Sequence, residues 1–271
     1  MKRTVHTPDS RLLAVEDRGD PAGWPVLVHH GTPSSRLVTS YGPYERDAAE
    51  RGLRLIGYDR PGYGESSPQP GRTVADTAAD VRAICAELGI ERLVTWGHSG
   101  GGPHALACAA LLPDLVTAAA ALASPAPYDV DGLDHFAGMD QDNVDDTRLF
   151  LTDKAAARKK LDKDRGDILA ASPDEAAREI ESTLTPTDAA LQVGDGEFHE
   201  FFLSCTQNGL APGSQGWWDD NCMLKPWGIR RRRHRRSGPA PVRRAGRVRA
   251  DWPRRMAGSA HSRRRGPAAR R

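Results

Sequence analysis

A serine flanked by glycines is the residue of this 271-residue chain whose surroundings best suit covalent chemistry. Residues 97–101 read GHSGG, with Ser99 at the centre, and they separate the apolar segment 92–96 from a predicted helix. Such a strand-to-helix turn exposes the serine hydroxyl at a strained backbone position, where neighbouring side chains would collide with strand and helix. Gly97 and Gly101 avoid that collision, so we expect Ser99 to be a nucleophile.

A second glycine-containing turn offers groups that a serine nucleophile needs. Residues 30–33 read HGTP and close the apolar run 25–29. The main-chain N–H groups of Thr32 and of Gly100, the residue after the serine, are expected at the same edge of a sheet. Two such donors stabilise the oxyanion that forms when a serine attacks a carbonyl. By itself HGTP is typical of an ordinary loop, and its place at a strand end before the serine favours an oxyanion hole.

Short apolar segments that alternate with amphipathic helices must position these turns. The alternation predicts an α/β fold, with a mostly parallel, doubly wound sheet covered by helices on both faces. A helix from Thr73 to Gly89 has the clearest signals, because Asp76 completes a capping box and glycine ends the helix. Its expected apolar stripe consists of Val74, Val81, Ile84 and Leu88. The predicted strands cover residues 11–16, 25–30, 54–58, 92–96 and 116–123, and a further helix covers 43–52.

Helical patterns alone follow residue 125, so the chain divides into segments. We predict an α/β core over 1–124, a helical lid with a return segment over 125–229, and an Arg-rich, disordered tail over 230–271. The lid is expected over the carboxyl ends of the strands, where open α/β sheets bind ligands. Its tryptophans either line an acyl pocket or form the lid's own small core: Trp217, Trp218 and Trp227.

Three motifs in a fixed order resemble those of the α/β-hydrolase superfamily, over roughly residues 5–229. They are HGTP at 30–33, DRPGYGES at 59–66 and GHSGGG at 97–102. The resemblance implies a serine hydrolase with Ser99 as nucleophile and with Thr32 and Gly100 as the oxyanion hole. It implies cleavage of an ester, amide or peptide bond of a small to medium apolar substrate through an acyl-enzyme. The segment 59–66 is expected to be a structural turn, and a serine nucleophile argues against dehalogenase or epoxide hydrolase chemistry.

The acid and the histidine of the superfamily's triad follow the nucleophile on the last strands, after the lid. Here that region is Arg-rich, so we expect those strands to be missing. Asp251 and His261 have suitable types but follow no apolar strand, Asp129 or Asp131 is a possible acid, and His199 is expected on the lid surface. The alternative prediction is therefore a catalytically inactive, truncated or frameshifted relative without the triad acid and histidine.

Charge divides the chain near Ile229. Residues 230–271 hold 17 Arg, one Asp and no Lys or Glu, a net charge of +16, so that the preceding residues carry −14 of the total of +2. Arg, Ala, Gly and Pro fill 32 of these 42 positions, and GC-only codons encode all four amino acids. A frameshift in a GC-rich gene explains this composition. Arginine runs also bind phosphates without specificity, but without interleaved aromatics or a fold we expect no specific nucleic-acid partner.

Other functional classes lack support in the sequence. The nine histidines form no His-x-x-x-His pair, and residues 97–102 lack the Lys-Ser/Thr ending of a phosphate loop, so we expect neither a metal nor a cofactor. The four cysteines have no metal or redox spacing and are predicted to be buried thiols. Without an apolar run of membrane-spanning length or a signal peptide, we expect a cytoplasmic protein acting on a small-molecule substrate. The sequence does not indicate the oligomeric state.

If the last strands are missing, the strand predicted at 116–123 has no neighbour on one side. It would present an unpaired edge, and part of a sheet face would meet water. We therefore expect the chain to aggregate or to form a loosely packed state.

Overall fold

A six-stranded sheet with the order β1-β2-β4-β3-β5-β6 forms the centre of the molecule. The computed structural model describes residues 1–128, 130–183 and 196–229, and its helices and strands belong to one unit. The pairs β4–β3, β3–β5 and β5–β6 are parallel, whereas β1–β2 and β2–β4 are antiparallel. The predicted α/β class with a mostly parallel sheet is confirmed. The strands are β1 Lys2–His6, β2 Leu12–Gly19, β3 Trp24–His29, β4 Leu53–Tyr58, β5 Leu93–His98 and β6 Val116–Leu122.

The register of the two central strands determines where the two glycine turns meet. β3 and β5 are parallel neighbours, with Val28 opposite Trp96 and His29 opposite Gly97. Because both strands end at the same edge of the sheet, the loop after β3 and the turn after β5 start side by side. The sheet alone thus brings together residues that are far apart in the sequence.

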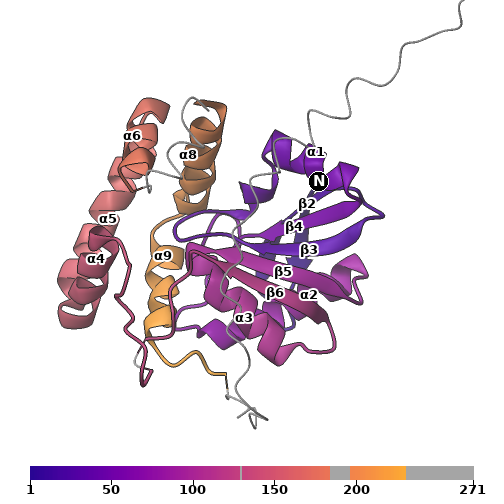
Figure 1. Cartoon of the computed structure of the whole chain (residues 1–271), viewed down its shortest axis with the longest axis horizontal. Coiled ribbons are helices and arrows are strands. Elements are labelled where there is room, and N and C mark those ends of the chain that lie inside the picture. Colours follow the sequence, from indigo (N-terminus) through magenta and orange to yellow (C-terminus); the bar gives the residue numbers. More distant parts are fainter. Residues whose placement is uncertain (129, 184–195, 230–271) are drawn as a thin grey trace, which may run out of the picture. The chain divides into compact units, whose positions relative to one another are not determined.

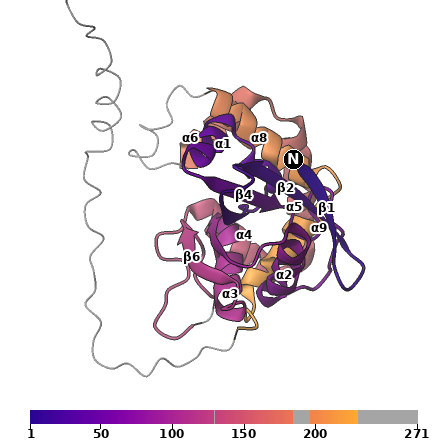
Figure 2. The same ribbon diagram turned by 90° about the vertical axis from the view of Figure 1, so that its right-hand side faces the viewer.

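Helices cover the two faces of the sheet (Figure 2). α1 (Gly42–Glu50) contacts β2 and β4, while α2 (Thr77–Leu88) and α3 (Gly102–Leu111) contact each other on the opposite face. The main core lies under α2 and α3, and all four cysteines are buried and free, as predicted. Fully buried members of this core include Leu13, Val15, Leu27, Ile56, Val81, Ile84 and Leu93.

The signals predicted for α2 act as expected. The N–H of Thr73 donates to the Asp76 carboxylate at 2.6 Å, and a short 3₁₀ turn, η2 (Val74–Asp76), leads into the helix. Gly89 ends the helix in the left-handed conformation, with φ of +66°. Val81 is among the stripe residues that are fully buried. The local sequence therefore specifies both ends of this helix.

A helical section follows β6 and lies beside the sheet (Figure 1). Its α8 contacts α5 and α6, and it also contacts the 3₁₀ turn η1 (Arg36–Thr39) of the core. The rings of Phe198 and Phe201 on α8 lie 5.5 and 5.0 Å from the Tyr41 ring, so α8 anchors the section to the core. The section consists of α4 Gln141–Thr152, α5 Lys154–Ala170, α6 Pro173–Thr183, α8 Gly196–Leu210, α9 Gln215–Asp219 and the 3₁₀ turn η4 Asp220–Leu224.

His199 lies on α8 of this section. The predicted surface position of His199 is wrong, because this side chain on α8 is only 5% exposed. It lies on the same stripe of α8 as the buried Leu203, Thr206 and Leu210, which follow it by 4, 7 and 11 positions, so it belongs to the covered face of this helix. In the part of the chain that the structure describes, no helix combines the length and the apolar character needed to cross a bilayer.

β6 lies at one end of the sheet. Within the described residues it pairs with β5 alone, and six of its seven residues, Thr117–Leu122, are exposed. The expected unpaired, solvent-exposed edge is confirmed for these residues. The predicted tail over 230–271, with Asp251 and His261, lies outside the described residues, as does Asp129.

Candidate active site

Ser99 lies at the junction of β5 and the 3₁₀ turn η3 (Ser99–Gly101), which leads into α3. Its φ of +49° belongs to the left-handed region, which is costly for a residue with a side chain. A Cβ on Gly97 would overlap the main chain of Gly101, and a Cβ on Gly101 would overlap the carbonyl of His29. Glycines are therefore required on both sides of the serine, and Ser99 itself remains partly exposed.

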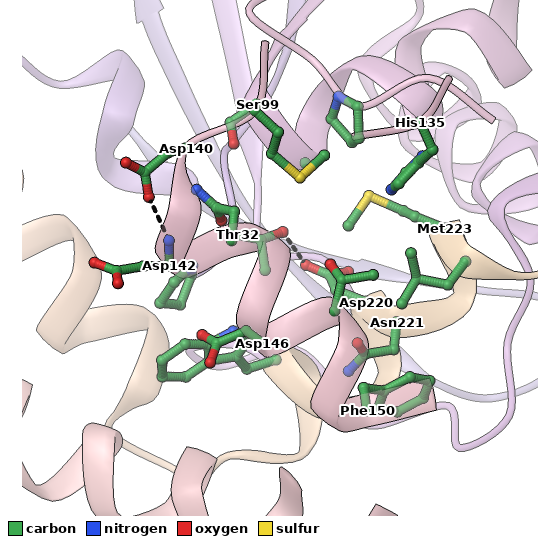
Figure 3. A pocket seen from close by; sticks show the side chains of 18 of the residues that line it. Thr32, Ser99, His135, Asp140, Asp142, Asp146, Phe150, Asp220, Asn221 and Met223 are labelled. Atoms are coloured by element: carbon green, nitrogen blue, oxygen red, sulfur yellow. Dashed lines mark hydrogen bonds between the residues drawn. The ribbon is translucent and has the colours of Figure 1, made fainter. Parts of the chain in front are cut away.

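The loop after β3 lies against this turn. A Cβ on Gly100 would come within 2.8 Å of the Thr32 Cβ, and a Cβ on Gly31 would lie 3.7 Å from the Ser99 Cβ. The peptide bond between Thr32 and Pro33 is cis. The structure thus brings together the three residues predicted to form the site, Ser99, Thr32 and Gly100 (Figure 3).

Ser99 and Thr32 line a cavity of about 980 Å³ between the sheet and the helical section. The rest of the lining comes mainly from the segment between β6 and α4 and from α4, α5, α9 and η4. The lining contains both apolar groups and carboxylates (Figure 3). The apolar group includes Met139, Phe150, Leu161, Trp218 and Met223, and the acidic group includes Asp140, Asp142, Asp146 and Asp164.

The three tryptophans of the return segment divide between the two roles considered for them. Trp217 and Trp218 line the cavity. Trp227 packs instead beside Cys222 in a small separate core, and its Nε1–H donates to the Met223 carbonyl at 3.0 Å. Only the first two are therefore placed to contact a bound molecule.

Buried histidines surround the turn but do not pair with the serine. His29, His30 and His104 are fully buried, and burial, followed by the charge of Arg60, lowers the pKa of each imidazole, that of His29 to about 3. They are therefore neutral near pH 7. Within residues 1–128, 130–183 and 196–229, no histidine is hydrogen-bonded to Ser99.

One histidine does line the cavity that contains Ser99. His135 lies in the segment between β6 and α4, and one ring nitrogen, Nδ1, is 3.0 Å from the Ala126 carbonyl (Figure 3). The candidate acid Asp131 is exposed and is not among the lining residues. The described ranges contain no group of three His, Cys, Asp or Glu side chains able to hold a metal ion.

The DRPGYGES turn is built around its first residue. The buried Asp59 carboxylate accepts hydrogen bonds from the main-chain N–H and the guanidinium of Arg36 at 2.7 and 2.5 Å. It also accepts one from the N–H of Glu65 at 3.1 Å, and the Ser66 hydroxyl donates to the Asp59 carbonyl at 2.7 Å. These bonds close the turn on itself, which agrees with the structural role expected for it.

Sequence reasoning missed a buried charged cluster beside the site, formed by Arg60, Arg72 and Asp220. Arg60 lies inside the DRPGYGES motif, and this position was the one available signal. Asp220 is 160 residues further along the chain, so residue spacing could not reveal the pairing.

Comparisons with known proteins agree with this geometry. The sequence model of the family described as "alpha/beta hydrolase fold" matches residues 25–177. A non-heme chloroperoxidase of Streptomyces lividans is 36% identical over 100 residues, 36% of each chain. A proline iminopeptidase of Xylella fastidiosa is 31% identical over 112 residues, 40% of this chain and 35% of that one, so the chain spans about a third of these relatives.

A solved structure extends the likeness to most of the chain. An alpha/beta hydrolase fold protein from Nakamurella multipartita superimposes with a TM-score of 0.54 and 26% identity, covering 81% of this chain and 73% of that one. The strand order, the turn at Ser99 and the family match over more than half of the sequence agree with one another. This chain belongs to the α/β hydrolase fold family.

Proposed function

We propose that this protein is a serine hydrolase that cleaves an ester, amide or peptide bond through an acyl-enzyme. Ser99 is the nucleophile, and the N–H groups of Thr32 and Gly100 stabilise the oxyanion. The main support is geometric: Ser99 is held at a φ of +49° and lines the same cavity as Thr32 and Gly100, which lie against each other.

The cavity supports a substrate of small to medium size with an apolar part. Phe150 and Trp218 contact each other with ring centroids 5.1 Å apart, and they provide an aromatic wall for an acyl group. In this proposal α4 and α5 act as a lid over the site. A relative named as a proline iminopeptidase supports amide or peptide bonds as one class of target.

A fluorophosphonate probe tests the nucleophile directly, because it reacts with activated serine hydroxyls. We expect covalent labelling of the full chain at Ser99 and its loss in Ser99→Ala. Ser124→Ala is the matched control, since the Ser124 hydroxyl also lines the cavity but donates to the Leu122 carbonyl at 3.0 Å. An unlabelled wild-type protein, or labelling that persists in Ser99→Ala, contradicts the proposal.

Substrate class is tested by comparing p-nitrophenyl esters of graded chain length with aminoacyl-naphthylamides. Turnover of esters alone identifies an esterase, and turnover of the naphthylamides identifies a peptidase. Because the aromatic wall is apolar, kcat/KM for the esters is expected to rise from acetyl to medium-length acyl chains.

A second candidate function is binding without catalysis: the protein would bind esters or amides in the cavity but would not hydrolyse them. The observation in its favour is that no histidine is bonded to Ser99 in the described part of the chain. Removal of a triad member costs several orders of magnitude in kcat and leaves only residual catalysis. This function predicts saturable binding of the esters or naphthylamides, with neither steady turnover nor labelling by the fluorophosphonate, and these results would distinguish it from the first function.

A further inference from the structure

A buried charged cluster lies directly behind the proposed oxyanion hole. The side chains of Arg60, Arg72 and Asp220 are all at least 96% buried. The Asp220 carboxylate accepts hydrogen bonds from Arg60 at 2.6 and 3.2 Å, from Tyr63 at 2.8 Å and from Arg72. It also accepts one from the Thr32 hydroxyl (Figure 3). Five donated hydrogen bonds converge on one carboxylate in this cluster.

The carboxylate is ionised. Burial alone would raise the pKa of the Asp220 carboxyl, but the charges of Arg60 and Arg72 outweigh burial and hold the pKa well below its usual range. Two guanidinium groups therefore share one negative charge, and removal of that charge would leave both cations buried without a counter-ion.

Arg60 connects this carboxylate to the loop after β3. Its guanidinium donates to the His30 carbonyl, to the Gly31 carbonyl at 3.1 Å and to the Thr32 hydroxyl at 3.0 Å. Three successive residues are thus held by one rigid, planar group, whose own orientation is fixed by Asp220. The direction of the Thr32 N–H depends on this loop conformation.

Arg72 connects the same carboxylate to the other side of the site. Its Nη1 lies 3.3 Å from Nε2 of His104, and Nδ1 of His104 lies 2.9 Å from the carbonyl of Gly100. Because a guanidinium only donates, Nε2 accepts, and the proton of the neutral ring lies on Nδ1, which donates to Gly100. Arg72 therefore restrains Gly100 through the imidazole.

We infer that Asp220 is a positioning residue shared by both oxyanion donors, acting through Arg60 on Thr32 and through Arg72 on Gly100. This inference rests on the proposed function for its catalytic meaning. It adds a specific dependence to that function, because the geometry of the oxyanion hole then depends on η4, the last element of the helical section. η4 also contributes Asn221 and Met223 to the cavity wall, so one short element contacts both the substrate space and the donors.

Binding of a tetrahedral mimic tests the catalytic side of the inference. An alkylboronic acid forms an oxyanion-like adduct with the serine, whereas the corresponding carboxamide is a neutral ground-state analogue. We expect Asp220→Asn to weaken boronic acid binding by about 100-fold, the size of effect seen when an oxyanion donor is lost, and to change carboxamide binding little. Equal losses for both ligands, or no loss for either, would overturn the inference.

Amide resonances test the positioning itself without any need for activity. In protein labelled with ¹⁵N at glycine and threonine, Asp220→Asn should shift the amide signals of both Thr32 and Gly100. Arg60→Lys should shift Thr32, and His104→Phe should shift Gly100. The matched control is Asp17→Asn on β2. It removes a carboxylate that pairs with Arg54 on β4 at 2.8 Å, and it should shift neither signal.

Together, the ligand-binding and amide-resonance experiments distinguish failure of the positioning role from failure of the proposed function. A purely structural Asp220 would lower the melting temperature of Asp220→Asn while both amide signals stay in place, which overturns the inference. If Asp220→Asn does not fold, Arg60→Lys and His104→Phe decide the question, and two unmoved donor signals overturn it. Wild-type protein that binds no boronic acid overturns the proposed function alone, because the amide shifts still test the positioning role.

Discussion

His29 and His104 lie one above the other beside the nucleophile turn, with ring centroids 6.3 Å apart and ring planes inclined by 23°. Both side chains are fully buried, and His30 is 1% exposed in the same region. Burial, the largest cause, and the charge of Arg60 lower the pKa of all three imidazoles below the usual 6.5. The fold therefore accommodates the three rings only in their neutral form.

This arrangement predicts that the folded protein loses stability on acidification at pH values well above those at which carboxylates titrate. Below pH 6.5 the unfolded chain binds protons at these histidines while the folded protein does not, so the stability falls as the pH decreases. Each histidine contributes about 1.4 kcal/mol per pH unit in this window. The free energy of unfolding, measured by urea denaturation, should therefore fall by about 4 kcal/mol between pH 7.5 and 5.5.

A variant at one of these positions checks the cause. In His104→Gln one titrating group is gone, so the difference between the two pH values should shrink by about a third. His6→Gln, at an exposed position that ends β1, should leave the difference unchanged. A stability that does not depend on pH over this range would show that the three rings are not confined to their neutral form.

Two glycine-to-alanine changes should shift stability in opposite directions. In Gly101→Ala the new methyl group overlaps the His29 carbonyl, so the free energy of unfolding should fall by about 2 kcal/mol or more. In Gly166→Ala, inside α5, the methyl group meets no atom within 4 Å, so the helix should gain up to about 1 kcal/mol. Urea denaturation of the two variants measures both effects, and a tolerated Gly101→Ala would contradict the described turn.

The exposed edge of β6 predicts self-association. Residues Thr117–Leu122 carry no charge and no proline, so the edge lacks the features that usually prevent strand pairing between molecules. We expect the protein to form oligomers or aggregates that grow with concentration in sedimentation velocity experiments. Ala119→Lys should reduce this association, whereas Ala155→Lys at an exposed position on α5 should not. A wild-type monomer at all concentrations, with a sharp cooperative melt, would refute this prediction.

Cavity shape predicts an effect on chain-length preference if the proposed function is correct. Trp218 contacts Phe150, and the Arg158 guanidinium lies 5.3 Å from its ring centroid, so its position is well defined. Trp218→Ala removes the indole from the cavity wall and enlarges the space for an acyl chain, so the ester with the highest kcat/KM should become longer by about two or more carbons. Trp227→Ala removes a side chain outside the cavity and should lower stability without changing that preference.

The sequence predicted the parallel part of the sheet because its strands are short apolar runs bounded by turn residues. β1 was missed for a physical reason: only Val5 among its five residues is buried, so a strand at an antiparallel edge shows almost no hydrophobic pattern. The strand predicted at 116–123 is confirmed as β6, although its alanines would also suit a helix, because this segment pairs with β5. Burial of His199 was also missed, because the elements that contact α8, namely α5, α6 and η1, are brought together only by the tertiary fold.

The residues around the nucleophile were predictable to different degrees. The positions of Ser99, Thr32 and Gly100 follow from local motifs and from the rule that parallel strands end at one edge. The Asp220 cluster was not predictable, since ion pairs between distant segments leave no periodic trace in the sequence. The sequence thus predicts the local geometry of the two turns but not the ion pairs between distant segments.

Arg60 and Asp220 are 160 positions apart in the sequence, and this separation also imposes an order on biosynthesis. In the part of the chain that the structure describes, all six strands precede residue 123, so a nascent chain contains these strands long before η4 leaves the ribosome. Until then, neither guanidinium has met the carboxylate that pairs with both. Contacts of such long sequence separation form slowly. The reactive centre therefore matures last, after the framework that surrounds it.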